Sequence, residues 1–227
     1  MNTKRHLLRV TLLFVVLMLS SSIQVMAQKY NQNREVEKAV ENNEDFRKGA
    51  ELAFRETSKT KEAILYFQKA ANTGLPIAMY YTGLCYYDLE DYKKAAEWFL
   101  KGAQKGDASA QYMLGCCYDD GEGLEVDLQK AAMWYTKAAE QGEASAQLNI
   151  ASFYRHGYGV EKDQKKAFYW YNKAAENGNA EAQFYLGYYY AKGLSVTKDM
   201  QKAHYWMQKA ADLGDDEAKK WLKEYNK

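Results

Sequence analysis

Two serines precede a lysine by three residues, the spacing that brings a nucleophilic hydroxyl next to an amine in penicillin-recognising enzymes. The two stretches run from Ser58 to Lys61 and from Ser195 to Lys198. Enzymes of that class also need Ser-Asp-Asn and Lys-Thr-Gly elements, and the chain contains neither. Both stretches fall between expected helices, which is the wrong structural context for the motif. A penicillin-interacting hydrolase is therefore the least favoured function that we consider, and we expect no catalytic residue.

Carboxylates gather near the middle of the chain, at Asp119, Asp120, Glu122, Glu125 and Asp127. A calcium loop needs alternating ligands, which this spacing does not provide. We interpret the group as a solvated loop that ends in a helix cap. His156 and His204 lie too far in the sequence from Cys116 and Cys117 for any known zinc spacing. We therefore expect no metal and no cofactor.

The first 27 residues differ in kind from the rest. Lys4, Arg5 and Arg9 precede an apolar run at residues 10–19, and Ala27 ends a small-residue pattern. This arrangement is typical of a secretory signal peptide. The apolar run is about half the length of roughly 20 residues that a membrane-spanning helix needs. We expect cleavage after Ala27, secretion to the periplasm and no stable membrane insertion afterwards; an uncleaved anchor is the alternative.

The charges of the chain are nearly balanced. There are 31 Lys and Arg residues against 30 Asp and Glu residues, and residues 1–27 hold three of the positive charges. A nearly neutral surface with mixed charges has no electrostatic footprint for nucleic acid or for an anionic membrane. We expect neither as a partner.

The chain is organised by an internal repeat. Residues 110–145 reappear as variants at 146–181 and 182–217. Repetition at this period predicts supersecondary units that bury each other's apolar faces. One glycine ends each unit, with spacings of 32, 36, 36 and 36 residues: Gly74, Gly106, Gly142, Gly178 and Gly214. We therefore expect five units.

Each unit is expected to contain two helices. Short acidic residues that can cap a helix precede the second helix: Asp91, Asp127, Asp163 and Asp199. The terminal glycine after a lysine-containing turn is a typical helix stop. In the first helix, a small residue recurs five positions after the first alanine, at Gly83, Gly115, Ala151 and Gly187. We expect it to let the second helix approach closely; the first unit carries Glu51 at the same place.

The recurring pattern A-x-x-x-L-G-x-x-Y-x-x-G-x-G-V-x-x-D-x-x-K-A-x-x-W-Y-x-K-A-A-x-x-G resembles the Sel-one-like repeat family, a relative of the tetratricopeptide repeats. It covers residues 46–217, with three full matches and two shorter ones before them. The resemblance implies an all-α, right-handed α/α superhelical solenoid of five helix-turn-helix repeats with a C-terminal capping helix. It also implies an adaptor or scaffold rather than an enzyme.

The expected organisation follows from these patterns. It comprises a signal peptide at 1–27, an N-terminal linker or capping helix at 28–45, repeats at 46–77, 78–109, 110–145, 146–181 and 182–217, and a capping helix at 218–227.

Most of the cysteines are expected to be buried as small apolar residues, and disulfides between them are doubtful. Cys85 and Cys117 share a repeat position, and equivalent helices lie roughly 8 to 10 Å apart, beyond the Cα separation of about 7 Å that a disulfide tolerates. Cys116 and Cys117 are adjacent and would point about 100° apart on a helix. An odd count leaves a reactive thiol as the alternative.

A candidate binding surface lies opposite the constant face of the first helices, where side chains change from unit to unit. Its residues are Tyr80, Leu84, Tyr87, Asp88, Tyr112, Asp119, Asp120, Arg155, His156, Phe184, Tyr188 and Lys192. We expect a concave groove, acidic in its first half and more basic in its second. Aromatic residues beside charges are typical anchors of a protein or peptide interface.

Two alternatives remain for this surface. Each aromatic side chain could instead pack against a neighbouring helix. The ligand could be a cell-envelope glycan or peptidoglycan, because Tyr and Trp rings also stack on sugars. The sequence thus predicts a non-catalytic scaffold for a protein or peptide, with envelope glycan as the alternative ligand.

Overall fold

The computed structural model describes residues 34–55 and 59–225, and every regular element in these ranges is a helix. The helices are α2 (Arg34–Asn42), α3 (Glu44–Arg55), α4 (Thr60–Asn72), α5 (Pro76–Asp88), α6 (Tyr92–Gln104), α7 (Ala108–Asp120), α8 (Leu128–Glu140), α9 (Ala144–His156), α10 (Gln164–Glu176), α11 (Ala180–Lys192), α12 (Met200–Asp212) and α13 (Asp216–Tyr225). The all-α prediction is confirmed. The expected signal peptide lies outside the described residues.

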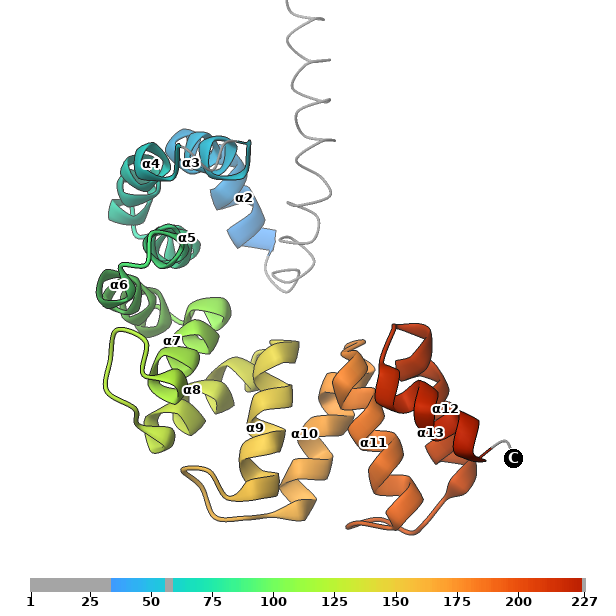
Figure 1. Cartoon of the computed structure of the whole chain (residues 1–227). Helices are drawn as coiled ribbons and strands as arrows, with labels where there is room; N and C mark the ends of the chain where they lie inside the picture. The colour runs from blue at the N-terminus through green and yellow to red at the C-terminus, as the bar shows by residue number, and fades with distance from the viewer. Residues whose placement is uncertain (1–33, 56–58, 226–227) are drawn as a thin grey trace, which may run out of the picture.

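The helices stack in chain order to form a curved solenoid (Figure 1). We call α3, α5, α7, α9 and α11 the A helices, and their partners α4, α6, α8, α10 and α12 the B helices. Each A helix packs against the B helix that follows it, and each B helix packs against the next A helix. In Figure 1, α5 and α7 lie on the inner side of the bend and α4 and α6 on its outer side. Helix α13 closes the array by packing on α12.

The expected caps of the B helices are confirmed. The carboxylate of Asp91 accepts a hydrogen bond from the amide of Lys94 at 3.2 Å, and Asp127 accepts from the amide of Lys130 at 3.0 Å. Asp163 and Asp199 cap α10 and α12 in the same way. These bonds satisfy amides that the first turn of a helix leaves without a partner.

Close helix packing explains the recurring small residue of the A helices. A Cβ atom on Gly83 would lie 2.5 Å from the ring of Phe99, and one on Gly115 would lie 2.6 Å from the ring of Tyr135. Real side chains do not approach so closely, so packing requires glycine at these two positions, whereas the fourth unit accommodates Ala151 at the same place. The predicted role of the small residue is confirmed.

The first unit follows the same rule with a different register, so the expectation for Glu51 is wrong. Gly49 occupies the small-residue position, because a Cβ atom there would lie 2.9 Å from the ring of Phe67. Glu51 is exposed. Gly49 precedes its aromatic partner by 18 residues, whereas Gly83 precedes Phe99 by 16. Applying the 16-residue separation of the second unit to Phe67 points to Glu51, two residues beyond the correct position. In the structure, Gly49 is the residue that packs against the Phe67 ring.

The connections between A and B helices contact the preceding unit. Gly123 and Gly159 have φ values of 76° and 60°. A Cβ atom on Gly123 would lie 2.1 Å from the carbonyl oxygen of Tyr92, and one on Gly159 would lie 2.1 Å from that of Leu128. Both carbonyls belong to the first residue of the previous B helix. Glycine is needed here for both the left-handed conformation and the close approach.

Cys85, Cys116 and Cys117 are free, and the expected burial holds for Cys85 and Cys117, whereas Cys116 is half-buried. Cys85 and Cys117 are buried, and burial raises the pKa of each of these two thiols to about 12. Such thiols remain protonated at neutral pH, so they are poor nucleophiles. None of the helices in the described ranges is long and apolar enough to cross a membrane.

Candidate partner-binding surface

The structure carries the predicted surface residues on four consecutive A helices, at four repeated helix positions. They are Tyr80, Leu84, Tyr87 and Asp88 on α5; Tyr112, Asp119 and Asp120 on α7; Arg155 and His156 on α9; and Phe184, Tyr188 and Lys192 on α11. We call the A-helix face that carries them the inner surface. Asp88, Asp120, His156 and Lys192 are exposed, and the other eight are half-buried.

The rings nearest the start of these helices pack against the B helix of their own unit. Tyr80 lies 6.1 Å from Phe99, and Tyr112 lies 5.9 Å from Tyr135, measured between ring centroids. Burial raises the pKa of both Tyr80 and Tyr112 well above the usual tyrosine range. Phe184 packs in the same manner against the core beneath α13. These rings therefore support the packing of A helices on their own B helices while keeping part of their surface exposed.

The next-to-last residues of α7 and α9 make polar contacts with other helices of the array. The hydroxyl of Tyr135 donates a 3.1 Å hydrogen bond to the carboxylate of Asp119. The guanidinium of Arg155 lies 4.6 Å from the ring centroid of Tyr185. Burial raises the pKa of Asp119, although the tyrosine hydrogen bond opposes this shift. Asp119 and Arg155 therefore serve internal contacts as well as the surface.

The next-to-last residue of α5, Tyr87, forms a hydrogen bond to the following unit. The hydroxyl of Tyr87 donates a 2.6 Å hydrogen bond to the carboxylate of Glu122, which lies in the connection after α7. This bond raises the pKa of Tyr87 well above its usual range. The sequence alone predicts only an acidic loop around Glu122, because its contact with Tyr87 spans 35 residues.

The last residue of each of these A helices is Asp88, Asp120, His156 or Lys192. We call these four exposed side chains the terminal row. Their order makes the acidic residues of the inner surface fall on α5 and α7, and the basic residues on α9 and α11.

An exposed aromatic side chain beside the terminal row was missed by sequence. Tyr158 stacks on His156 with ring centroids 5.1 Å apart and an interplanar angle of 16°. Its sequence signal is an aromatic residue between Gly157 and Gly159, where side chains of a turn point outward. From the sequence alone, these residues predict only a turn. Tyr158 extends the aromatic character of the inner surface to its edge.

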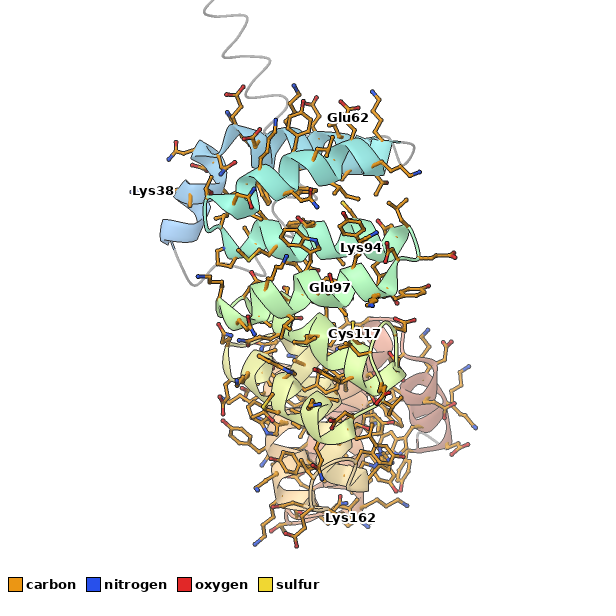
Figure 2. The ribbon with its side chains drawn as sticks, turned by 90° about the vertical axis from the view of Figure 1, so that its left-hand side faces the viewer. Lys38, Glu62, Lys94, Glu97, Cys117 and Lys162 are labelled. Atoms are coloured by element: carbon orange, nitrogen blue, oxygen red, sulfur yellow. The ribbon has the colours of Figure 1, made fainter. Side chains whose placement is uncertain are left out.

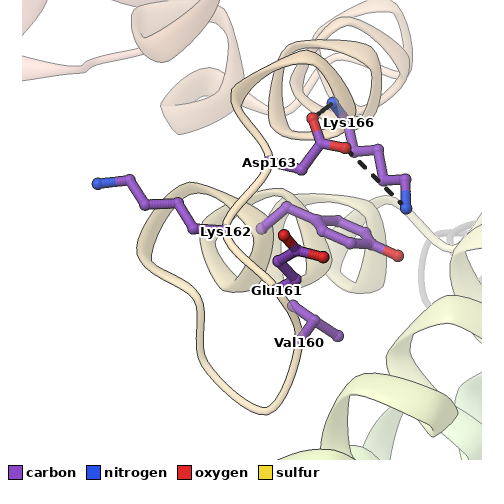
Figure 3. Close-up of a pocket in the computed structure, with 6 residues that line it drawn as sticks. Val160, Glu161, Lys162, Asp163 and Lys166 are labelled. Carbon is purple, nitrogen blue, oxygen red and sulfur yellow. Dashed lines mark hydrogen bonds and ion pairs between the residues drawn. The ribbon is translucent and has the colours of Figure 1, made fainter.

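A shallow hollow of about 340 Å3 lies at the start of α10 (Figure 3). Lys166 lies 4.0 Å from the carboxylate of Asp163 and 5.0 Å from the ring centroid of Tyr154. Helix α8 repeats this arrangement, with Lys130 at 3.0 Å from Asp127. The walls of the hollow are therefore helix-capping contacts that recur in every long repeat. We interpret the hollow as a feature of the repeat fold rather than as a ligand site.

The residues considered for enzyme and metal chemistry do not form such sites in the described part of the chain. Ser195 has a φ of 60° and lies with Lys198 in the connection between α11 and α12, outside any helix. Ser58 lies outside the described residues. No group of three His, Cys, Asp or Glu side chains within 34–55 and 59–225 is arranged to hold a metal ion.

Five stretches of the chain match the Sel1 repeat: residues 57–75, 76–107, 108–143, 144–179 and 180–215. The chain belongs to the Sel1 repeat family. Proteins with Sel1 and tetratricopeptide-like repeats are generally scaffolds for protein interactions, and Sel1 repeat proteins are typically non-catalytic. No curated protein is significantly similar to this Sel1 repeat chain.

Two solved Sel1 repeat structures resemble the chain throughout most of its length. A Sel1 repeat protein from Oxalobacter formigenes is 34% identical, with a TM-score of 0.74 over 84% of this chain. A protective antigen of uropathogenic Escherichia coli strains, which displays an SLR fold, is also 34% identical, with a TM-score of 0.70 over 82% of this chain. The match spans 58% of the first protein and 42% of the second.

Proposed function

We propose that this Sel1 repeat chain is a secreted, periplasmic scaffold without catalytic activity, which binds a protein or peptide through its inner surface. The observation that carries the proposal is the contrast between two faces of the A helices. The stacking face repeats small residues such as Gly83 and Gly115. The inner surface changes from unit to unit and combines half-buried rings with exposed charges. Aromatic residues surrounded by polar groups are typical anchors of protein interfaces.

A capture experiment tests the inner surface. The residue directly after the recurring small residue of the A helices is Leu84, Cys116, Ser152 or Tyr188. The fold therefore already accommodates a serine at this position. Replacing Leu84 and Tyr188 by serine should remove apolar contact area; because both side chains also pack partly against the core, the melting temperature of the variant is measured beside its capture. We expect the double variant to capture much less partner from an envelope extract than the unaltered chain does.

The matched control removes aromatic rings from the B helices. Tyr169 and Tyr205 are exposed on α10 and α12. The Tyr169→Ser and Tyr205→Ser double variant should capture as much partner as the unaltered chain. Equal capture by the inner-surface and control variants would contradict the proposal, provided that their melting temperatures are alike.

Export and ligand class are tested separately. Mass spectrometry of the periplasmic protein should find Gln28 at its N-terminus, and a full-length chain in the cytoplasm would contradict export. Co-sedimentation with purified sacculi tests the glycan alternative. Binding to sacculi that the Leu84 and Tyr188 replacements abolish would favour glycan over protein as the ligand.

A further inference from the structure

The terminal row divides the inner surface by sign of charge. Asp88 and Asp120 end α5 and α7, whereas His156 and Lys192 end α9 and α11. All four side chains are exposed and occupy the same repeat position. A partner that lies along the row therefore meets two carboxylates first and basic groups afterwards.

The three formal charges of the terminal row, on Asp88, Asp120 and Lys192, form no ion pair within the described part of the chain. The ion pairs found there join residues three apart, such as Asp91 with Lys94 at 2.6 Å and Asp127 with Lys130 at 3.0 Å. Four of these pairs lie at the starts of B helices and one at the start of α13. None of them includes Asp88, Asp120 or Lys192. Local pairing thus balances charge at the B helices and leaves the row available to a partner.

The acidic half of the row also opposes the electrostatics of its own helices. The C-terminal end of a helix carries partial negative charge, which disfavours carboxylates and favours cations. Asp88 and Asp120 occupy this unfavourable end, whereas Lys192 complements it. The B helices follow the usual preference, with Asp127 at the start and Lys137 in the last turn of α8. Residues that break a local rule followed elsewhere are typical of functional sites.

We propose that the inner surface selects a polypeptide segment whose charges are grouped, with basic residues against α5 and α7 and acidic residues against α9 and α11. This inference rests on the proposed function and names the class of partner. Successive A helices are one to two helix-packing distances of about 8 to 10 Å apart, so the row is roughly 30 to 60 Å long. An extended segment of about 9 to 18 residues spans that length.

A polypeptide fits this order of charges better than the other possible occupants. A neutral glycan has no charge to complement the row, and a uniformly anionic glycan would be repelled by Asp88 and Asp120. A polypeptide can carry both signs in sequence. Electrostatic complementarity of this kind fixes the register of a partner and excludes wrong partners.

The test uses the mature chain and two labelled ten-residue peptides of identical composition. One has four lysines, two tyrosines and four glutamates in blocks; the other has lysines and glutamates in alternation. We expect the block peptide to bind at least tenfold more tightly by fluorescence anisotropy at low salt, with the difference lost at 0.5 M NaCl. Equal affinities at low salt would overturn the inference.

Charge-reversal variants test whether the terminal row causes the preference for the block peptide. The Asp88→Lys and Asp120→Lys double variant should lose the preference for the block peptide. Adding His156→Glu and Lys192→Glu should restore it, because the peptide can then bind in the opposite direction. All four side chains are exposed, so folding should tolerate the changes. Failure of the fourfold variant to recover the preference would overturn the inference.

The matched control makes the same change in net charge on the B helices. Glu97 and Glu140 are exposed on α6 and α8, and Figure 2 looks onto this side of the solenoid, with Glu97 labelled beside Lys94. The Glu97→Lys and Glu140→Lys double variant should keep the peptide preference. Loss of the preference in this control would show a general charge effect and overturn the inference.

Two further outcomes separate the inference from the proposed function. If Leu84→Ser and Tyr188→Ser reduce partner capture but both peptides bind equally, the proposed function stands and the charge order is wrong. If sedimentation velocity shows salt-sensitive dimers that exclude the block peptide, a second copy of the chain occupies the surface and the inference is overturned.

Discussion

Leu213 occupies the repeat position from which a side-chain amide would donate to Gln183, and the Oε1 atom of Gln183 is buried without a hydrogen-bond partner. In the two preceding units this position, 30 residues after the buried glutamine, holds an amide. Gln141 donates to Gln111 at 2.7 Å, and Asn177 donates to the next buried glutamine at 2.9 Å. The last unit therefore lacks one hydrogen bond of a repeating ladder.

Replacing Leu213 by glutamine should stabilise the protein. The new amide would satisfy Gln183, and a net gain of about 1 kcal/mol is typical of one such bond. For a chain of this size that gain corresponds to a rise of about 2 to 4 °C in Tm. Leu213 is 58% exposed, so little apolar burial is lost. Leu213→Glu is the control, since it removes the same side chain without supplying a donor; an equal rise in Tm would contradict the hydrogen-bond explanation.

Alanine at Gly123 should be far more harmful than alanine at Gly106. Both glycines have positive φ, so each replacement incurs backbone strain of about 1 to 2 kcal/mol. Gly106 has free space around it, whereas a Cβ atom on Gly123 would lie 2.1 Å from the backbone oxygen of Tyr92. We expect Gly123→Ala to lower the free energy of unfolding by at least about 2 kcal/mol more than Gly106→Ala. Urea denaturation measures the difference, and similar values would refute a tight contact between units.

Acid should destabilise the protein through its helix caps. The backbone amide of Lys130 and then its ammonium group lower the pKa of Asp127 below the ordinary 3.8. A carboxyl group whose pKa is lower in the folded state stabilises that state above the unfolded pKa and loses the effect as pH falls through the folded pKa. Thermal melts of Asp127→Asn, which retains a capping side chain, should therefore show a smaller loss of Tm between about pH 4 and pH 2. A loss equal to that of the unaltered chain would count against this role.

The carboxylate of Asp88 should lower the free energy of unfolding while strengthening the binding of the block peptide. Although its side chain is exposed, partial desolvation by neighbouring groups raises the pKa of Asp88, and its place at the end of α5 opposes the helix dipole. Both effects disfavour the ionised carboxylate in the folded state above its unfolded pKa. Asp88→Asn should therefore raise the free energy of unfolding at pH 7 by about 0.3 to 1 kcal/mol, with the gain lost below pH 4, while weakening the block peptide. A less stable variant at pH 7 would contradict this account.

Much of the fold could be predicted because its signals are local. The contact between Asp127 and Lys130 spans three residues, and a glycine such as Gly106 acts through its own φ angle. Such features depend on backbone conformation that neighbouring residues determine, so they appear at constant spacing in the sequence. The repeat, the caps and the stops together indicated a helical solenoid.

The candidate surface could be predicted only in outline. Helical periodicity placed Asp119 and Asp120 on the variable face of α7, but it could not show that Asp119 accepts a hydrogen bond from Tyr135 while Asp120 stays exposed. That distinction depends on which B-helix side chain has a hydroxyl within reach. Tyr87 and Glu122 likewise meet across 35 residues. Long-range partners of this kind leave no spacing signal in one chain.

The sequence by itself determined the number of units, their caps and the face of each A helix that varies. Tertiary packing decided the register of the first unit, where the ring of Phe67 selects Gly49 over Glu51. It also decided which polar groups are satisfied internally, as at Asp119, and which remain unsatisfied, as at Gln183. The physical reason is range: a cap or turn is formed by atoms a few residues apart, whereas packing and hydrogen-bond satisfaction depend on atoms that only the folded chain brings together.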